Sequence, residues 1–85
     1  MNNRLSPRER EHVRRVKEMP CSVCDAEGPS EAHHLEQHYQ YTIIPLCTDC
    51  HRGSINGLHG QKAMWRVTKK TELSCLNETI RCLMT

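Results

Sequence analysis

The sequence predicts a small α+β domain that is held together by a metal ion. The chain has only 85 residues, of which 36% are apolar and none is Phe, so its core is small. Domains of this size often need a bound metal or disulfides for stability. Four of the six cysteines form two CxxC pairs, Cys21 with Cys24 and Cys47 with Cys50. Helical and strand-like patterns flank these pairs, which favours a mixed α+β architecture.

The two CxxC pairs, separated by residues 25–46, are the strongest signal in the sequence. Each CxxC turn directs two thiolates at one point, and two turns complete the tetrahedral four-sulfur site typical of structural Zn²⁺. Iron fits the same site. The alternatives are two unrelated pairs or a thioredoxin-like redox motif, but no βαβ pattern accompanies the cysteines. Cys75 and Cys82 lack neighbouring ligands, so we expect both to be buried apolar side chains on a helix.

The N-terminal segment predicts a basic helix over residues 7–18. Ser6 and Glu9 have the spacing of a capping box, and the proline between them suits the first helical position. The apolar stripe of this helix is thin and includes Val13 and Val16.

Residues 31–46 are expected to form a β-hairpin. The strands are predicted at residues 32–35 and 42–44, since the second run is rich in β-branched side chains. A short helical turn at residues 49–52 follows the hairpin.

Two helices are expected within residues 59–84, one over residues 59–70 and one over 72–83. Three glycines within residues 53–60 limit any helix there. Trp65 is expected in the core. In the first helix, Ala63, Met64 and Val67 are also predicted to face inward. In the second, apolar side chains recur at helical spacing, at Leu73, Leu76, Ile80 and Leu83.

Charge is distributed unevenly along the chain. Residues 21–51 carry five acidic and no basic side chains, whereas residues 1–20 and 52–72 have net charges of +3 and +4. Two basic flanks around a metal centre suit a polyanion such as DNA, although a solvated surface explains any single charge equally well. The expected phosphate contacts are Arg52, Lys62, Arg66, Lys69 and Lys70, and Arg14 and Arg15 are further candidates.

The sequence also predicts a cytoplasmic protein without membrane contact. No apolar run approaches the roughly 18 residues that a spanning helix requires. The first ten residues, MNNRLSPRER, lack the apolar stretch of a secretory signal.

Four of the six histidines lie close to the cysteine pairs in sequence. His33 and His34 are adjacent, His51 directly follows the second CxxC, and His59 lies in the string NGLHG. With these histidines, the strings CSVC, AHH, IPLCTDCH and NGLHG resemble the HNH (ββα-metal) endonuclease motif in its zinc-stapled form. The longer string from GPSEAHH to NGLHG resembles, more narrowly, the RecA-dependent nuclease family. The resemblance covers about residues 20–66.

This resemblance implies a single HNH nuclease domain over residues 1–85, with a ββα-metal core at residues 20–60 and flanking helices. It also implies a bacterial or phage protein that works in the host cytosol and associates with the nucleoid.

The resemblance also implies roles for the histidines. His34 matches the general base, while His33, His51 and, as a third ligand, His59 match the residues that hold one catalytic divalent ion. That ion is Mg²⁺, Mn²⁺ or Zn²⁺. The middle Asn of the HNH signature has three candidate counterparts here: Gln37, Gln40 and Asn56.

The predicted function is therefore metal-dependent hydrolysis of phosphodiester bonds in DNA, in recombination or repair, with RecA filaments as a partner that the resemblance implies. The alternatives are a zinc-stapled DNA-binding module without catalysis and an adaptor that recruits a recombinase. The histidine pair argues against the first alternative, because a four-sulfur structural site needs no imidazoles nearby.

Overall fold

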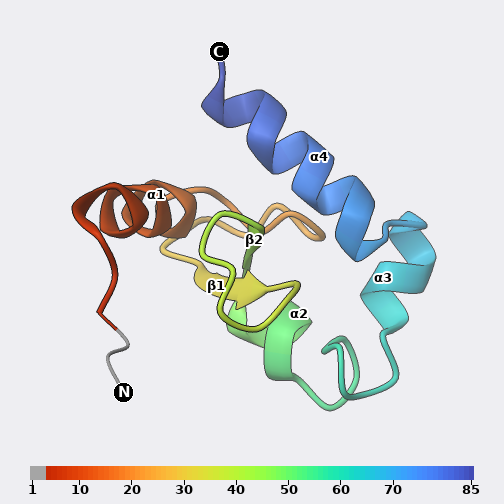
Figure 1. The fold of residues 1–85 in the computed structure, drawn as a ribbon. Coiled ribbons are helices and arrows are strands. Elements are labelled where there is room, and N and C mark those ends of the chain that lie inside the picture. Colours follow the sequence, from red (N-terminus) through yellow and green to blue (C-terminus); the bar gives the residue numbers. More distant parts are fainter. Residues whose placement is uncertain (1–3) are drawn as a thin grey trace.

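Residues 4–85 of the computed structural model form a two-stranded sheet and four helices (Figure 1). The expected domain of residues 1–85 is thus described from residue 4 onward. Along the chain the elements are α1 (Pro7–Lys17), β1 (Glu31–His34), β2 (Ile43–Leu46), α2 (Thr48–Arg52), α3 (Ala63–Thr68) and α4 (Glu72–Leu83). The predicted α+β class and the order of the elements are confirmed.

Helix α1 begins at the capping box that the sequence predicts. The Ser6 hydroxyl accepts a hydrogen bond from the Glu9 backbone N–H at 3.1 Å, and the Glu9 carboxylate accepts one from the Ser6 N–H at 2.8 Å. Val16 anchors the helix and is fully buried. The helix ends at Lys17, one residue earlier than expected.

The strands pair antiparallel, with His33 opposite Ile44 and His34 opposite Ile43. All four residues of β2 are buried, because both faces of this small sheet are covered. Ile44 and Leu46 belong to the main core. Alternate residues of a strand point to opposite faces, so Ile43 points away from that core. Helix α1, which contacts both strands, covers this second face (Figure 1).

The main core is built around the cysteines. Trp65, on α3, is only 5% exposed, and its Nε1–H donates to the Cys50 carbonyl at 3.1 Å. The prediction that Trp65 is a core residue is confirmed. The members of the core cluster are Cys21, Val23, Ile44, Leu46, Cys50, Trp65, Cys75 and Leu76.

The helix expected over residues 59–70 is shorter, because residues 53–62 form turns. The backbone folds closely on itself in these turns. A Cβ added to Gly57 would lie 2.4 Å from the Gly53 carbonyl oxygen, and one added to Gly60 would lie 2.3 Å from that of Ser54. Side chains at these glycines would therefore collide with the backbone, which is why the segment needs glycine.

Helix α4 has the predicted bounds, but a different face of it is buried. Its buried residues are Cys75, Leu76 and Thr79, whereas Leu73 is 71% exposed and Ile80 is 40% exposed. Small side chains allow close contact between helix and sheet, so α4 packs through Cys75 and Thr79 together with Leu76. The helical spacing of Leu73 and Ile80 identified the helix but not its buried face.

Two expectations of burial were wrong. Val67 is 76% exposed, because it lies on the side of α3 away from Trp65. Cys82 is exposed, while Cys75 is buried as expected. The last turn of α4, which carries Cys82, extends beyond the sheet (Figure 1).

The turns of residues 53–62 give a test of the fold. We expect Gly57→Ala to lower the free energy of unfolding by about 1–3 kcal/mol, because the new methyl group overlaps backbone atoms that cannot move separately. Thermal denaturation followed by circular dichroism measures the change. Ser54→Ala, at an exposed position in the same turns, is the control and should unfold like the wild type. Equal stability of both variants would contradict this account of the glycine.

Candidate functional site

Four sulfur atoms from two separate turns converge beside the sheet. The Sγ atoms of Cys21, Cys24, Cys47 and Cys50 all lie within 4.8 Å of one another. Within residues 4–85 this is the only group of three or more His, Cys, Asp or Glu side chains whose ligand atoms come together in this way. The residue types and the spacing fit a metal ion such as zinc in a structural site.

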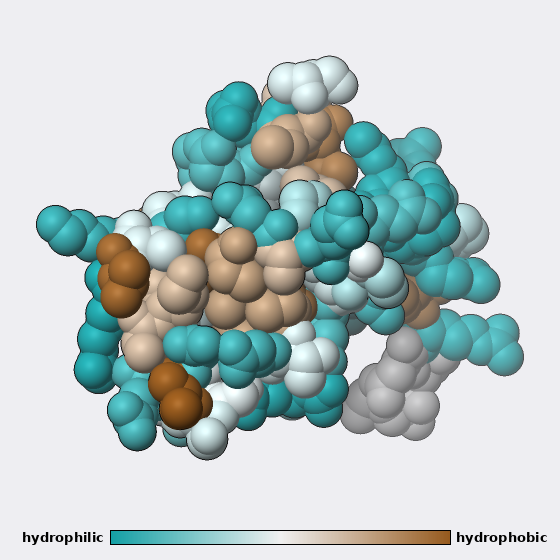
Figure 2. All heavy atoms as spheres, turned by 180° about the vertical axis from the view of Figure 1, so that it is seen from behind, coloured by the Kyte–Doolittle hydropathy of each residue, from teal (hydrophilic) through white to brown (hydrophobic). Residues whose placement is uncertain are grey.

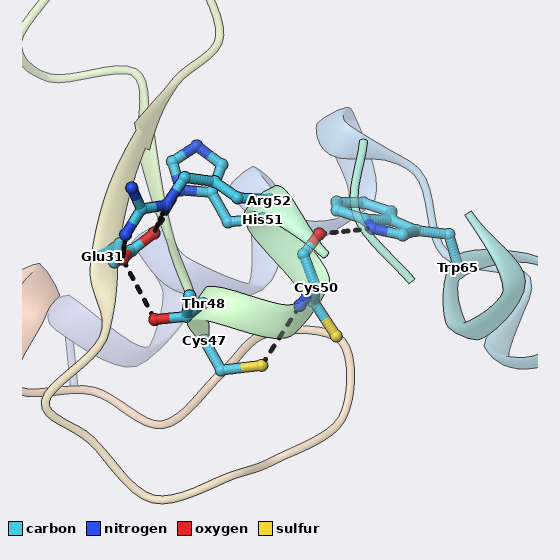
Figure 3. Close-up of polar contacts among 7 residues, drawn as sticks. All are labelled: Glu31, Cys47, Thr48, Cys50, His51, Arg52 and Trp65. Atoms are coloured by element: carbon cyan, nitrogen blue, oxygen red, sulfur yellow. Dashed lines mark hydrogen bonds and ion pairs between the residues drawn. The ribbon is translucent and has the colours of Figure 1, made fainter. Parts of the chain in front are cut away.

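Backbone N–H groups surround the sulfur atoms. The N–H of Val23 donates to Cys21 Sγ at 3.4 Å. The N–H of Cys50 donates to Cys47 Sγ, also at 3.4 Å (Figure 3). Burial opposes ionisation of Cys21, but hydrogen bonds from the backbone of Cys24, Cys47 and Val23 outweigh it and lower its pKa. Ionisation of one thiol is therefore favoured by the fold itself.

Two other thiols of the group, those of Cys24 and Cys50, resist ionisation. Burial raises the pKa of Cys50 and of Cys24, and the neighbouring sulfur atoms raise both further. Several thiolates this close together repel one another unless a cation lies between them. A bound divalent ion removes this conflict, which is a chemical reason to expect the group to hold metal.

The surrounding chain is tied to this cysteine group. The Ser22 N–H donates to the Pro45 carbonyl at 2.9 Å, which joins the first CxxC turn to β2. Lys70 Nζ donates to the Ser22 carbonyl at 2.5 Å. All six cysteines are free thiols. An ion bound to the four sulfurs would therefore connect the segments before β1 and after β2.

A second cluster lies where β1 meets α2. The rings of His33 and His51 approach to 5.1 Å between centroids at an angle of 66°. His33 Nε2 lies 2.8 Å from a carboxylate oxygen of Glu72, and His51 Nδ1 lies 2.7 Å from one of Glu31. Within residues 4–85, the opposite nitrogens, Nδ1 of His33 and Nε2 of His51, make no hydrogen bond. Histidines that bind metals commonly have a carboxylate behind the ring in this way.

Glu31 is the centre of a network in this cluster (Figure 3). Its carboxylate accepts hydrogen bonds from Arg52, His51 and the Thr48 hydroxyl, and the Thr48 bond measures 3.1 Å. The Arg52 guanidinium and the His51 ring lower the pKa of Glu31 to about 2. Glu31 is therefore ionised at neutral pH and can only accept a hydrogen bond, so His51 Nδ1 is the donor in this contact.

His34 lies on the other face of the hairpin and is exposed. Its Nε2 lies 2.9 Å from the Gln40 Oε1 atom, so Gln40 is the candidate for the HNH Asn that contacts the expected base. The Asn56 side-chain amide instead donates to the Asp49 carboxylate at 2.7 Å, a bond that ties the glycine-containing turns to α2. Gln37 is exposed.

The structure separates the predicted metal ligands. His33 and His51 come together, whereas His59 is exposed within the turns that replace the expected helix. Within the described residues, His33, His51 and His59 do not form a three-ligand group like that of the cysteines.

The five basic residues expected to contact phosphate also differ in their surroundings. Arg52 pairs with Glu31, and Lys70 is bonded to the Ser22 carbonyl. Lys62, Arg66 and Lys69 are exposed along α3 and its two ends.

Sequence reasoning did not find Glu31 and Glu72. The sequence position of Glu31 does indicate its place in the cluster, because it lies two residues before His33 on a strand and therefore on the same face. No local sequence pattern indicates Glu72, since its contact with His33 joins residues 39 positions apart in the chain.

Comparison with protein-family models, curated proteins and solved structures found no match for this chain. In the part of the chain from residue 4 to residue 85, no helix has the length and apolarity needed to cross a membrane.

The cysteine group predicts that metal is required for folding. Removal of the ion by a chelator should unfold the domain, because metal binding contributes on the order of 10 kcal/mol in small zinc domains. Circular dichroism before and after chelation measures the loss of structure. A metal-free sample with the native spectrum would contradict a structural role for the ion.

A pair of cysteine variants provides a matched test of the ligand set. Cys24→Ser should lower the bound zinc, measured by elemental analysis, and lower the melting temperature. Cys82→Ser is the control, because this exposed thiol lies outside the group and its removal should change neither quantity. Full zinc content in Cys24→Ser would exclude Cys24 as a ligand.

Proposed function

We propose that this protein is a metal-dependent DNA endonuclease of the HNH type, with β1, β2 and α2 as its ββα-metal core. The observation that supports this most is the approach of His33 and His51 to 5.1 Å between ring centroids. Each of these imidazoles has a carboxylate behind it, an arrangement that a purely structural four-sulfur site does not require. The resemblance of the sequence to HNH nucleases supports the same function.

In this proposal the catalytic ion is held by His33 Nδ1 and His51 Nε2. Glu72 and Glu31 fix the orientation of the two rings. His59 remains a predicted third ligand. When bound, Mg²⁺, Mn²⁺ or Zn²⁺ would act as a Lewis acid toward the phosphate and the leaving oxygen.

His34 is the proposed general base. Gln40 Oε1 can only accept a hydrogen bond, so its contact with His34 Nε2 places the proton on that nitrogen. Nδ1 of His34 is then the basic atom that can take a proton from the attacking water. Gln40 would hold the ring in this orientation and tautomer.

The substrate proposed for this site is DNA. Lys62, Arg66 and Lys69 are exposed and can approach phosphates without losing an internal ion pair, since within residues 4–85 none of them is paired with an acidic side chain. Their contribution to binding should fall with added salt, as expected for contacts that release counterions from DNA.

Plasmid nicking in the presence of Mg²⁺ or Mn²⁺ tests the proposed activity. His34→Ala should abolish detectable cutting, because a general base contributes about 100- to 10,000-fold to such a reaction. Glu36→Gln, at an exposed position just after β1, is the control and should cut like the wild type. Full activity of His34→Ala with native zinc content would remove His34 from this role.

The same assay, with and without RecA filaments, tests the proposed partner. Stimulation by filaments would support a RecA-dependent nuclease. Binding of DNA without nicking under any metal condition would instead favour the zinc-stapled binding module or the recombinase adaptor.

Glu72 provides a separate test of the histidine site. Glu72→Gln should weaken binding of Mn²⁺ by about 10- to 100-fold, because it removes the carboxylate behind His33. Calorimetric titration of the zinc-loaded protein with Mn²⁺ measures the affinity directly. Glu78→Gln is the matched control, since Glu78 lies on the same helix and pairs only with Arg81 within the described residues. Equal affinity in both variants would exclude Glu72 as the residue that orients a metal ligand.

A further inference from the structure

The hairpin loop, residues 35–42, presents two aromatic side chains to solvent. Tyr39 is 62% exposed and Tyr41 is 50% exposed. The Leu35 N–H donates to the Thr42 carbonyl at 3.0 Å and closes the base of the loop, and Leu35 packs against the main core. The loop is therefore anchored at its base, while both tyrosine rings are open to contact.

Helix α1 supports one of these rings. The His12 ring lies 5.1 Å from the Tyr41 ring, between centroids, at an interplanar angle of 52°. Within residues 4–85, His12 Nε2 is buried and has no hydrogen-bond partner, so the contact with Tyr41 is one of ring packing. His12 thus joins the hairpin loop to α1.

A groove of about 310 Å³ lies along α1 beside His12. Two exposed cations in its wall, Arg8 and Arg15, lie four residues before His12 and three residues after it, and therefore on the same side of the helix. Hydrophilic side chains predominate over the end of the molecule that α1 forms, in the view from behind (Figure 2). The residues that line this α1 groove are Pro7, Arg8, Glu11, His12 and Arg15.

The α1 groove has an excess of positive charge. Within residues 4–85, Arg8 pairs with no acidic side chain. Arg15 donates to the Leu83 carbonyl at 3.1 Å, and this neutral acceptor leaves its charge in place. Glu11, the acidic residue of the groove, pairs with Arg14. The groove therefore suits an anion such as phosphate.

His34 lies on the same face of the hairpin as α1. It is paired with Ile43 across the two strands, and residues directly opposite each other point to the same face. That is the face that α1 covers (Figure 1). Gln40, which stands between the two tyrosines in the sequence, approaches His34 Nε2 to 2.9 Å. The tyrosines therefore flank the residue that holds the proposed general base.

We propose that the hairpin loop and the α1 groove together bind an unpaired stretch of DNA beside His34. Tyr39 and Tyr41 stack on bases, while Arg8 and Arg15 contact phosphates of the same strand. Exposed aromatic rings beside a basic groove bind single strands well, because every unpaired base has a free π-face. In a duplex, neighbouring base pairs cover these faces. The choice of DNA rests on the proposed function, to which this site adds that nucleotides next to the bond that is cut are unpaired.

Fluorescence anisotropy with a labelled oligonucleotide, as a single strand and as the matching duplex, tests this site. The zinc-loaded protein is used without added Mg²⁺ or Mn²⁺, and the DNA is checked afterwards for cuts. Tyr39→Ala should raise the Kd for the single strand by about 5- to 150-fold, because stacking on one base is lost. The Kd for the duplex should change by less than about twofold, since its bases are not available to the ring.

Further variants separate stacking from other effects. Tyr39→Phe keeps the ring and should bind the single strand like the wild type. Leu73→Ala, at an apolar position on α4 that is 71% exposed, is the control away from the site and should also bind normally. Since Tyr39 is largely exposed, its variants should keep the native circular dichroism and zinc content. Arg8→Ala should reduce the dependence of Kd on salt, because one phosphate contact is lost.

Several results would overturn the proposal. These are an unchanged Kd of Tyr39→Ala for the single strand, an equal loss of affinity for the duplex, or a loss in Tyr39→Phe as large as that in Tyr39→Ala. Failure of the proposed function gives a different result. Binding of single strands that depends on Tyr39, without nicking under any metal condition, would support this site and contradict the nuclease.

Discussion

The fold depends on the convergence of four cysteine thiols from two turns that lie on either side of the hairpin. The core around them is small, and Cys21 and Cys50 are themselves members of it. Without an ion, burial and the neighbouring sulfur atoms raise the pKa of Cys50, which opposes ionisation of its thiol. With an ion, the same group becomes a cross-link between the segment before β1 and the segment after β2. An ion held by these cysteines would therefore be part of the core.

The cysteine group also positions the histidine site. Cys47 caps α2, Cys50 points into the core, and His51 is the next residue of the same short helix (Figure 3). A helix turns about 100° per residue, so a cysteine that faces the core directs the following side chain toward β1. There His51 meets His33 and Glu31. A helix of five residues would not hold this orientation alone, because isolated short helices are unstable.

The features that the sequence predicted well are local ones. The capping box at Ser6, the CxxC pairs and the bounds of α4 all depend on residues close together in the chain. The features that it missed depend on contacts between distant segments. Hydrophobic spacing identified α4 as a helix. Its rotation about its own axis is fixed by packing, which buries Cys75, Leu76 and Thr79. Of the histidines predicted to share an ion, His33 and His51 lie close together, and the carboxylate of Glu72 beside His33 comes from a helix outside the resemblance.

Helix α4 shows why the C-terminal part of the chain belongs to the site. Its first turn supplies Glu72 to His33, and one turn later Cys75 packs in the core cluster that contains Cys21. A shift of α4 along its axis would move both contacts together, because a helix is stiff over such a short length. The orientation of His33 is thus coupled to the packing around the four clustered cysteines through two paths, α2 and α4. A substitution in either cluster should therefore alter the geometry of the other, although the two clusters share no residue.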